Sequence, residues 1–224
     1  MLVRSVFFFV SALTPLILFG CEVGESEATV TGKTACGGAI ALSDRAFRTV
    51  NPDMLDRKLI DDAIRFYSSA ARCGEGGELF EADSALLDVA EDHSEDMARL
   101  DFFAHDSEVE GKTSLVDRYT LGEVSYRAAA ENLALVGLFN FPNGEQFEVI
   151  DVDECRFRDP ETKTYYRRQT YAELAALVVD GWMNSPGHRA NLLNDRYSRM
   201  GSGIAINTDN EYCGWVYATQ NFAD

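Results

Sequence analysis

Basic residues are scarce in this sequence. The chain of 224 residues has 20 Lys and Arg against 37 Asp and Glu, which gives a formal net charge of −17. A protein that binds nucleic acid needs a basic surface, and docking on anionic lipid needs a polybasic patch. The charge balance therefore argues against DNA or RNA as a partner and indicates a well-solvated acidic surface.

Several catalytic and cofactor motifs are also absent. The sequence has no C-x-x-C, which argues against a redox dithiol and against a zinc ribbon. It has no H-E-x-x-H, G-x-S-x-G or S-x-x-K, so the zinc peptidase, α/β-hydrolase and serine acyl-transfer signatures are missing. It has neither a P-loop nor G-x-G-x-x-G, and no internal repeat. The usual motif-bearing enzyme classes therefore find no support.

The N-terminus has the pattern of an export signal. Arg4 precedes an almost wholly apolar run over residues 5–19, which is shorter than the ~20 residues that span a bilayer. The run ends in Leu-Phe-Gly-Cys21, which is similar to the lipobox of bacterial lipoproteins. We predict a lipoprotein signal peptide over residues 1–20 and a lipid at Cys21 that anchors the protein outside the cytoplasm, to the cell or outer membrane. An ordinary secretory signal or a membrane anchor, with Cys21 incidental, are the alternatives.

Four further cysteines agree with export. They are Cys36, Cys73, Cys155 and Cys213. An even number in an oxidising compartment suggests two disulfides, and four cysteines allow three pairings. We favour Cys36–Cys73 and Cys155–Cys213, because each pair would tie an irregular segment to a predicted regular element.

Apolar periodicity predicts two long helices and a short one in the first half of the chain. Asn51-Pro52 has the features of a helix start, and Gly74 supplies a stop. Asp83 can cap the second helix. Apolar positions recur along that helix at helical spacing: Leu86, Ala90, His93, Met97 and Leu100. The short helix is expected around 115–119, and the run 132–137 is typical of a buried strand.

The second half adds helical segments and two strands. Tyr171 begins a third long helix. Ser185-Pro186 ends it and begins another helical turn, because serine suits the N-cap and proline the first helical position. Strands are expected over 201–206 and 212–221, with a hairpin turn at Asp209-Asn210. Helices precede and separate the strands, so the class is α+β or layered α/β/α.

The domain organisation is simple. Residues 21–50 begin rich in Gly, Ser, Thr and Glu and indicate a tether and N-terminal extension that becomes ordered near Cys36. Residues 51–224 form one globular domain, and a chain with 46% apolar residues can bury a core of that size.

Several blocks of sequence point to one family. They are His93-Ser94-Glu95-Asp96-Met97, Phe102-Phe103-Ala104-His105, Ala130-Glu131-Asn132-Leu133-Ala134, the block from Val179 to Leu193, Met200-Gly201-Ser202-Gly203 and Thr219-Gln220-Asn221-Phe222. In order and spacing they resemble the bacterial branch of the CAP/SCP family (cysteine-rich secretory, antigen 5 and pathogenesis-related proteins). The resemblance implies an α+β fold, a three-layer α/β/α sandwich with a mainly antiparallel central sheet and an open cleft. Residues 138–170 are longer than the usual connection, which suggests an insertion near the cleft.

The resemblance also implies a set of cleft residues. Many family members carry two histidines and two acidic residues there. His105 and Glu131 match two of these positions, and His188 supplies the second histidine. The second acidic position falls near Ser185, so the full set of four is not present. Two neutral imidazoles can hold a divalent metal such as zinc, and a nearby carboxylate can orient an imidazole or accept a proton.

Each of these residues also has a structural interpretation. His93 lies on an apolar helix stripe, so we expect a core histidine rather than a ligand. Ser185 is expected to cap a helix rather than to act as a nucleophile. The helix that it caps should keep His188 neutral, because its positive end disfavours imidazolium. Glu131 beside a buried strand would be costly without a partner, which favours a role in the site.

Two hypotheses of function follow. The first is a membrane-tethered binding module outside the cytoplasm, whose cleft takes a small apolar molecule, a peptide or an envelope component. The second is a metal-assisted hydrolase, peptidase-like, in which His105 and His188 hold the metal and Glu131 is the general base. A zinc hydrolase normally has a third protein ligand, and none is identifiable, so the binding module ranks first.

Overall fold

The computed structural model describes residues 3–5, 34–141, 146–210 and 212–224. Most of the predicted signal peptide, with Cys21, lies outside the described residues. Its Val3–Ser5 segment is described as strand β1, which pairs antiparallel with β6 (Gln146–Asp151). Within the described part of the chain, no helix has the length and apolar character needed to cross a membrane.

The described elements alternate between helices and strands. The helices are α1 (Arg57–Gly74), α2 (Ser84–Leu100), α3 (Leu115–Leu121), α4 (Tyr171–Met183) and α5 (Pro186–Leu192), with 3₁₀ turns η1 (Cys36–Gly38), η2 (Asp44–Phe47) and η3 (Pro52–Met54). The remaining strands are β2 (Thr34–Ala35), β3 (Ile40–Ala41), β4 (Glu81–Ala82), β5 (Ala129–Gly137), β7 (Arg156–Arg158), β8 (Arg199–Asn207) and β9 (Trp215–Ala223).

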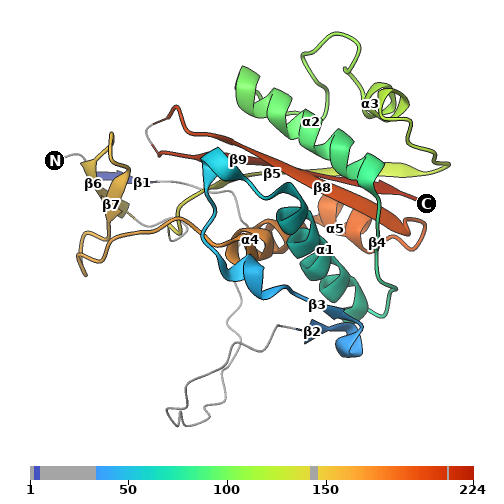
Figure 1. Cartoon of the computed structure of the whole chain (residues 1–224), viewed down its shortest axis with the longest axis horizontal. Helices are drawn as coiled ribbons and strands as arrows, with labels where there is room; N and C mark the ends of the chain where they lie inside the picture. Colours follow the sequence, from blue (N-terminus) through green and yellow to red (C-terminus); the bar gives the residue numbers. More distant parts are fainter. Residues whose placement is uncertain (1–2, 6–33, 142–145, 211) are drawn as a thin grey trace.

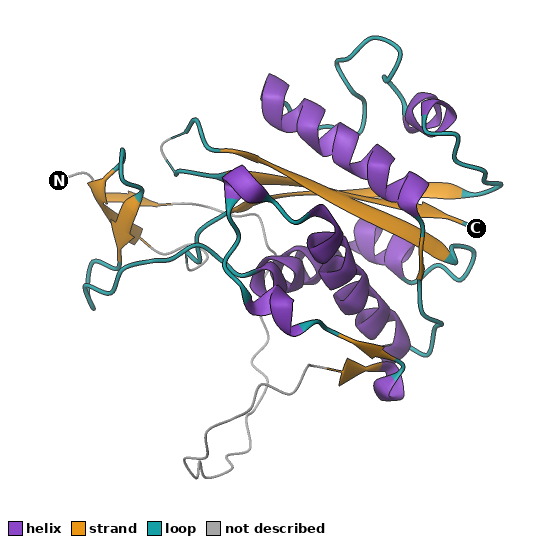
Figure 2. Cartoon of the chain, viewed as in Figure 1, coloured by secondary structure: helices purple, strands orange, loops and turns teal. Residues whose placement is uncertain are grey.

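The main sheet has four strands in the order β4-β8-β9-β5. β9 pairs antiparallel with both β8 and β5, and only the short β4 runs parallel to its neighbour. α2 covers one face of this sheet, and α1, α4 and α5 cover the other (Figures 1 and 2). The predicted three-layer sandwich with a mainly antiparallel sheet is therefore confirmed.

Two glycines of β8 let α2 lie close to the sheet. A Cβ on Gly201 would stand 2.1 Å from the backbone nitrogen of Leu87, and one on Gly203 would stand 2.4 Å from the Cα of Glu91. Any larger residue at either position would push the helix away. The intervening Ser202 faces the opposite layer, where its backbone N–H donates to Asp61 of α1.

The helix predictions hold with two corrections. α2 begins after Asp83, whose side chain accepts from two backbone N–H groups as expected, but Leu100 at its end is 40% exposed rather than buried. α1 begins at Arg57, not directly after Asn51-Pro52. Asn51 caps the 3₁₀ turn η3 instead, and Asp56 caps α1 by accepting from the N–H of Leu59. The Asn-Pro pattern fits either kind of turn, which is why it misplaced the helix start.

The main core reaches into the N-terminal extension. Leu42, Ala46 and Val50 are buried in the same cluster as the inner faces of α1 and α4, so the ordered part of the domain begins before residue 51. The disulfide between Cys36 and Cys73 ties this extension to the last turn of α1. Both predicted pairings are confirmed, because Cys155 also pairs with Cys213.

Residues 138–170 contain β6 and β7, which form a separate three-stranded sheet with β1. The Cys155–Cys213 disulfide links this segment to the loop between β8 and β9. The segment leaves β5 after Gly137, six residues beyond Glu131, or about 20 Å along an extended strand. It therefore begins at the far end of β5 from Glu131.

A buried carboxylate closes the outer edge of β8. The Oδ1 of Asp61 accepts from the backbone nitrogen of Ser202 at 2.8 Å, and Asp61 itself is only 3% exposed. Burial raises the pKa of Asp61 from 3.8 to about 6, although the bond from Ser202 opposes the shift. The folded state therefore binds this proton more tightly than the unfolded chain does. As the pH rises from about 4 through about 6, this contribution to the free energy of unfolding is lost.

Asp61→Asn should stabilise the protein at pH 8 and lose that advantage as the pH falls toward 4. Asparagine keeps an acceptor for the Ser202 N–H without the buried charge, and a shift of about two pKa units corresponds to about 3 kcal/mol. Urea unfolding at both pH values measures the difference. Asp62→Asn, on the same helix but more exposed, is the control. A difference for Asp61→Asn that does not change with pH would contradict the account.

Candidate functional site

The site is built on β5, which lies at one edge of the main sheet. Successive side chains of a strand point to opposite faces, so Glu131 and Asn132 serve different layers. Glu131 contacts residues that follow α2, whereas Asn132 contacts α5 on the other side of the sheet. An edge strand can in this way bring groups from both faces to one place.

Glu131 is held by a buried arginine. Arg118 Nη2 donates to both carboxylate oxygens of Glu131, at 2.9 and 2.7 Å. The side chains of Arg118 and Glu131 are only 1% and 3% exposed. Arg118 Nη1 donates to the His105 carbonyl at 3.0 Å and to two further backbone carbonyls. Both carboxylate oxygens thus accept charge-assisted hydrogen bonds from one guanidinium nitrogen, which satisfies the buried carboxylate and fixes its orientation.

Local sequence determines where Arg118 lies. Ser114 and Asp117 form a capping box at the start of α3: Ser114 Oγ accepts from the Asp117 N–H, and Asp117 accepts from the Ser114 N–H. Arg118 is the next residue, and its side chain passes under the loop that carries His105. The start of α3 therefore positions the guanidinium that neutralises Glu131.

His105 rests on the same carboxylate. Its Nδ1 lies 3.0 Å from Glu131 Oε1, while its side chain is 59% exposed. This hydrogen bond raises the pKa of His105, and burial opposes the shift. An ionised carboxylate can only accept, so the Nδ1 of His105 carries the proton and Nε2 is the nitrogen that Glu131 does not hold.

His188 approaches from the other side of β5. It lies in the first turn of α5, and its carbonyl accepts from Asn132 Nδ2 at 3.3 Å. Burial lowers the pKa of His188, and the charge of nearby His105 lowers it further. The direction agrees with the neutral imidazole expected from sequence, but burial rather than the helix terminus is the main cause. The structure thus brings His105, Glu131 and His188 to one edge of the sheet.

Two other predicted residues stay outside this group. His93 is fully buried in α2, where its Nε2 lies 3.1 Å from the Ala104 carbonyl, as expected for a core histidine. Ser185 occupies the N-cap position of α5 as predicted, but its side chain makes no capping hydrogen bond. The backbone carbonyl of Ser185 accepts from Arg189 instead.

Comparison with known proteins agrees with this architecture. The sequence profile of the CAP family, described as the cysteine-rich secretory protein family, matches residues 70–222. The chain belongs to the CAP family. This CAP chain is 28% identical over 182 residues to the uncharacterized membrane protein YlbC of Bacillus subtilis (strain 168), covering 81% of the chain and 38% of that protein. It therefore spans well under half the length of that relative.

A solved structure shares the fold. An extracellular protein containing an SCP domain, from Bacillus anthracis str. Ames, is 28% identical and superposes with a TM-score of 0.50. The match covers 79% of this chain and 44% of that one. Similarity to a bacterial CAP/SCP domain thus extends from sequence to three-dimensional structure.

The CAP domain does not supply a full metal site at this edge. Among the described residues, no group of three or more His, Cys, Asp or Glu side chains could hold a metal ion. His105 and His188 are two imidazole donors, and both oxygens of Glu131 already accept from Arg118. The donor set does not fit a catalytic zinc centre, which uses three protein ligands.

Arg118 and Asn221 are the site residues that sequence reasoning missed. With its amide oriented to donate, the Nδ2 of Asn221 lies 3.2 Å from Glu131 Oε2. One sequence feature could have found Arg118. A carboxylate beside a buried strand needs a cationic partner. Arg118 is a candidate, because it directly follows a Ser-x-x-Asp capping box and so has a defined place in the first turn of a helix.

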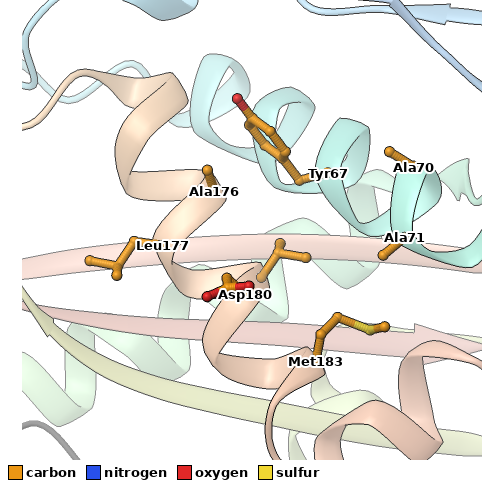
Figure 3. A pocket seen from close by; sticks show the side chains of 8 residues that line it. Tyr67, Ala70, Ala71, Ala176, Leu177, Asp180 and Met183 are labelled. Carbon is orange, nitrogen blue, oxygen red and sulfur yellow. The ribbon is translucent and has the colours of Figure 1, made fainter. Parts of the chain in front are cut away.

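An apolar groove lies elsewhere, between α1 and α4 on the layer opposite α2 (Figure 3). Its volume is about 530 Å³. The lining side chains come from both helices: Tyr67, Ala70, Ala71, Ala176, Leu177, Val179, Asp180 and Met183. His105, Glu131 and His188 do not line it, so the apolar groove and the two histidines are separate features.

Arg118→Met should lower the free energy of unfolding by about 3–5 kcal/mol, because it leaves the carboxylate of Glu131 buried without its cation. Arg99→Met is the control. Arg99 also pairs with a buried acid, Asp96, but the Arg99 side chain is 59% exposed and Lys112 still pairs with Asp96, so the loss should stay at about 1 kcal/mol. Urea denaturation of both variants measures the two losses. Equally small losses of unfolding free energy in the two variants would mean that the Arg118–Glu131 pair does not hold the site at β5 together.

Proposed function

We propose that this CAP domain is a binding module that works outside the cytoplasm, and not a hydrolase. The observation that carries the proposal is the occupation of both Glu131 oxygens by Arg118. A general base must be free to take a proton from water or substrate. Both oxygens of Glu131 accept from the Arg118 guanidinium, which fixes the orientation of the carboxylate and makes it an anchor for His105 rather than a base.

The ligand class best supported is a small apolar molecule bound in the groove between α1 and α4. The groove is shallow and open to solvent, and apolar side chains make up most of its lining, with Asp180 and Tyr67 as the residues that carry polar groups. Small-molecule sites typically combine an apolar lining with a few polar groups. The sequence led us to expect a small apolar molecule, a peptide or an envelope component at the histidines, and of these the half-exposed imidazole of His105 best suits a polar group of a peptide or envelope component.

Metal-assisted hydrolysis is the second candidate. It is favoured by one observation, the closeness of His105 and His188 that lets the charge of one lower the pKa of the other. Two imidazoles alone make a weak site, and the described residues offer no third ligand. The binding module therefore ranks first.

The proposed location rests on sequence and on relatives. The similar proteins are named as a membrane protein and as an extracellular protein. Two disulfides are typical of an oxidising compartment. We propose that a lipid at Cys21 tethers the domain to the cell or outer membrane, and radiolabelled palmitate incorporation that is lost in Cys21→Ser would test it.

Ala71→Trp should abolish binding of a fluorescent polyene fatty acid, because the indole fills the groove. Titration of the probe into the protein, read by fluorescence, measures the affinity. The control Ala190→Trp places the same side chain on the exposed face of α5 and should bind like the wild type. His105→Ala should also retain binding.

The same preparations distinguish the alternatives. No probe binding by the wild type, or equal binding by Ala71→Trp, would remove the groove as the ligand site. Cleavage of a quenched peptide mixture that requires added zinc and disappears in His188→Ala would replace the binding module with the hydrolase.

A further inference from the structure

We propose that His93 is a positioning residue, which fixes the loop that presents His105 by donating a hydrogen bond to the carbonyl directly before it. His93 Nε2 lies 3.1 Å from the oxygen of Ala104, and the ring is completely buried. The inference concerns the loop that carries His105 and does not depend on the groove between α1 and α4 as the ligand site.

The chain must turn sharply to bring His105 back over β5. α2 ends at Leu100, and Asp101 adopts a left-handed conformation with φ of 55°. The Asp101 carboxylate accepts from the Tyr217 hydroxyl at 2.9 Å, and Phe102 lies beside the His93 ring with centroids 6.1 Å apart. These contacts fix the start of the turn, three and four residues before His105.

The protonation of His93 follows from its partners. A carbonyl oxygen can only accept, so Nε2 must carry the proton. Nδ1 is buried without a partner among the described residues, so a second proton there would have no acceptor. Burial also lowers the pKa of His93. The ring is therefore a neutral hydrogen-bond donor with one defined tautomer. This suits a residue that positions the loop and not a metal ligand or a base.

Three contacts then locate His105. His93 holds the carbonyl of Ala104, Arg118 holds the carbonyl of His105, and Glu131 holds the Nδ1 of its imidazole. The first two fix the backbone on both sides of the residue, and the third fixes the ring. Loss of the first contact lets the loop move, so the third contact weakens although neither Glu131 nor Arg118 has changed.

The test is nitrogen NMR of the imidazoles in the protein, without ligand and at one pH. The chain has only three histidines, so each ring can be assigned by substitution. The wild type should show His93 as the Nε2–H tautomer, with that proton protected from exchange, and His105 as the Nδ1–H tautomer. An exchangeable, unprotected His93 Nε2–H in the wild type overturns the proposal without any variant.

A matched pair of variants then isolates the donor. Gln and Met have similar length, but only Gln keeps an N–H group that can reach the Ala104 carbonyl. His93→Met should lose the Nδ1–H signature of His105, and His93→Gln should restore it. Ser94→Ala is the control for destabilisation alone, because it removes two buried hydrogen bonds of α2 that do not involve the loop.

Loss of stability without loss of the His105 signature would assign His93 a packing role only and overturn the proposal. An identical His105 spectrum in the Met and Gln variants would do the same. Because these spectra need no ligand, a failed fatty-acid titration leaves the outcome unaffected, and the two proposals can fail separately.

Discussion

The ion pair between Arg118 and Glu131 is the interaction on which the arrangement of the site depends. A carboxylate that is 3% exposed is costly unless its charge is compensated. The Arg118 guanidinium compensates the charge by donating to both carboxylate oxygens. The same guanidinium donates to the His105 carbonyl, and the same carboxylate accepts from the His105 ring. One buried pair therefore joins α3, β5 and the loop after α2.

The fold supplies the conditions for that pair. The glycines of β8 allow α2 to lie directly on the sheet, and the loop that follows α2 can then reach the edge strand. Because β5 is at the edge, its outer side is accessible to α5 and His188. Side chains also donate hydrogen bonds to backbone carbonyls of this strand. The indole Nε1 of Trp182, for example, donates to the Leu133 carbonyl at 2.9 Å. Such contacts close an edge that would otherwise invite pairing with another chain.

Local patterns predicted much of the fold because they are set by neighbouring residues. Asp83 caps α2, Tyr171 begins α4, and the alternation of glycine in Gly201-Ser202-Gly203 marks a strand packed closely against a helix. The start of α1 was misplaced because Asn51-Pro52 suits a 3₁₀ turn as well as a helix. The pattern identifies a turn but not how long the helical conformation continues.

The site was predictable only in part. Resemblance to a family supplied His105, Glu131 and His188, but the partner of Glu131 is 13 residues away and meets it only through tertiary packing. The groove was not predictable either. It is lined by side chains of both α1 and α4, among them the small Ala71 and Ala176, and nothing local in the sequence pairs those helices.

We infer that Arg118 holds Glu131 and keeps its carboxylate from binding a metal or a substrate. A crystal structure of the domain soaked in zinc would show whether this is so. Both Glu131 oxygens should remain within hydrogen-bond distance of Arg118, whether or not zinc density lies beside His105 and His188. Rotation of the Glu131 carboxylate away from Arg118 to coordinate zinc would contradict it and would restore the hydrolase as the leading interpretation.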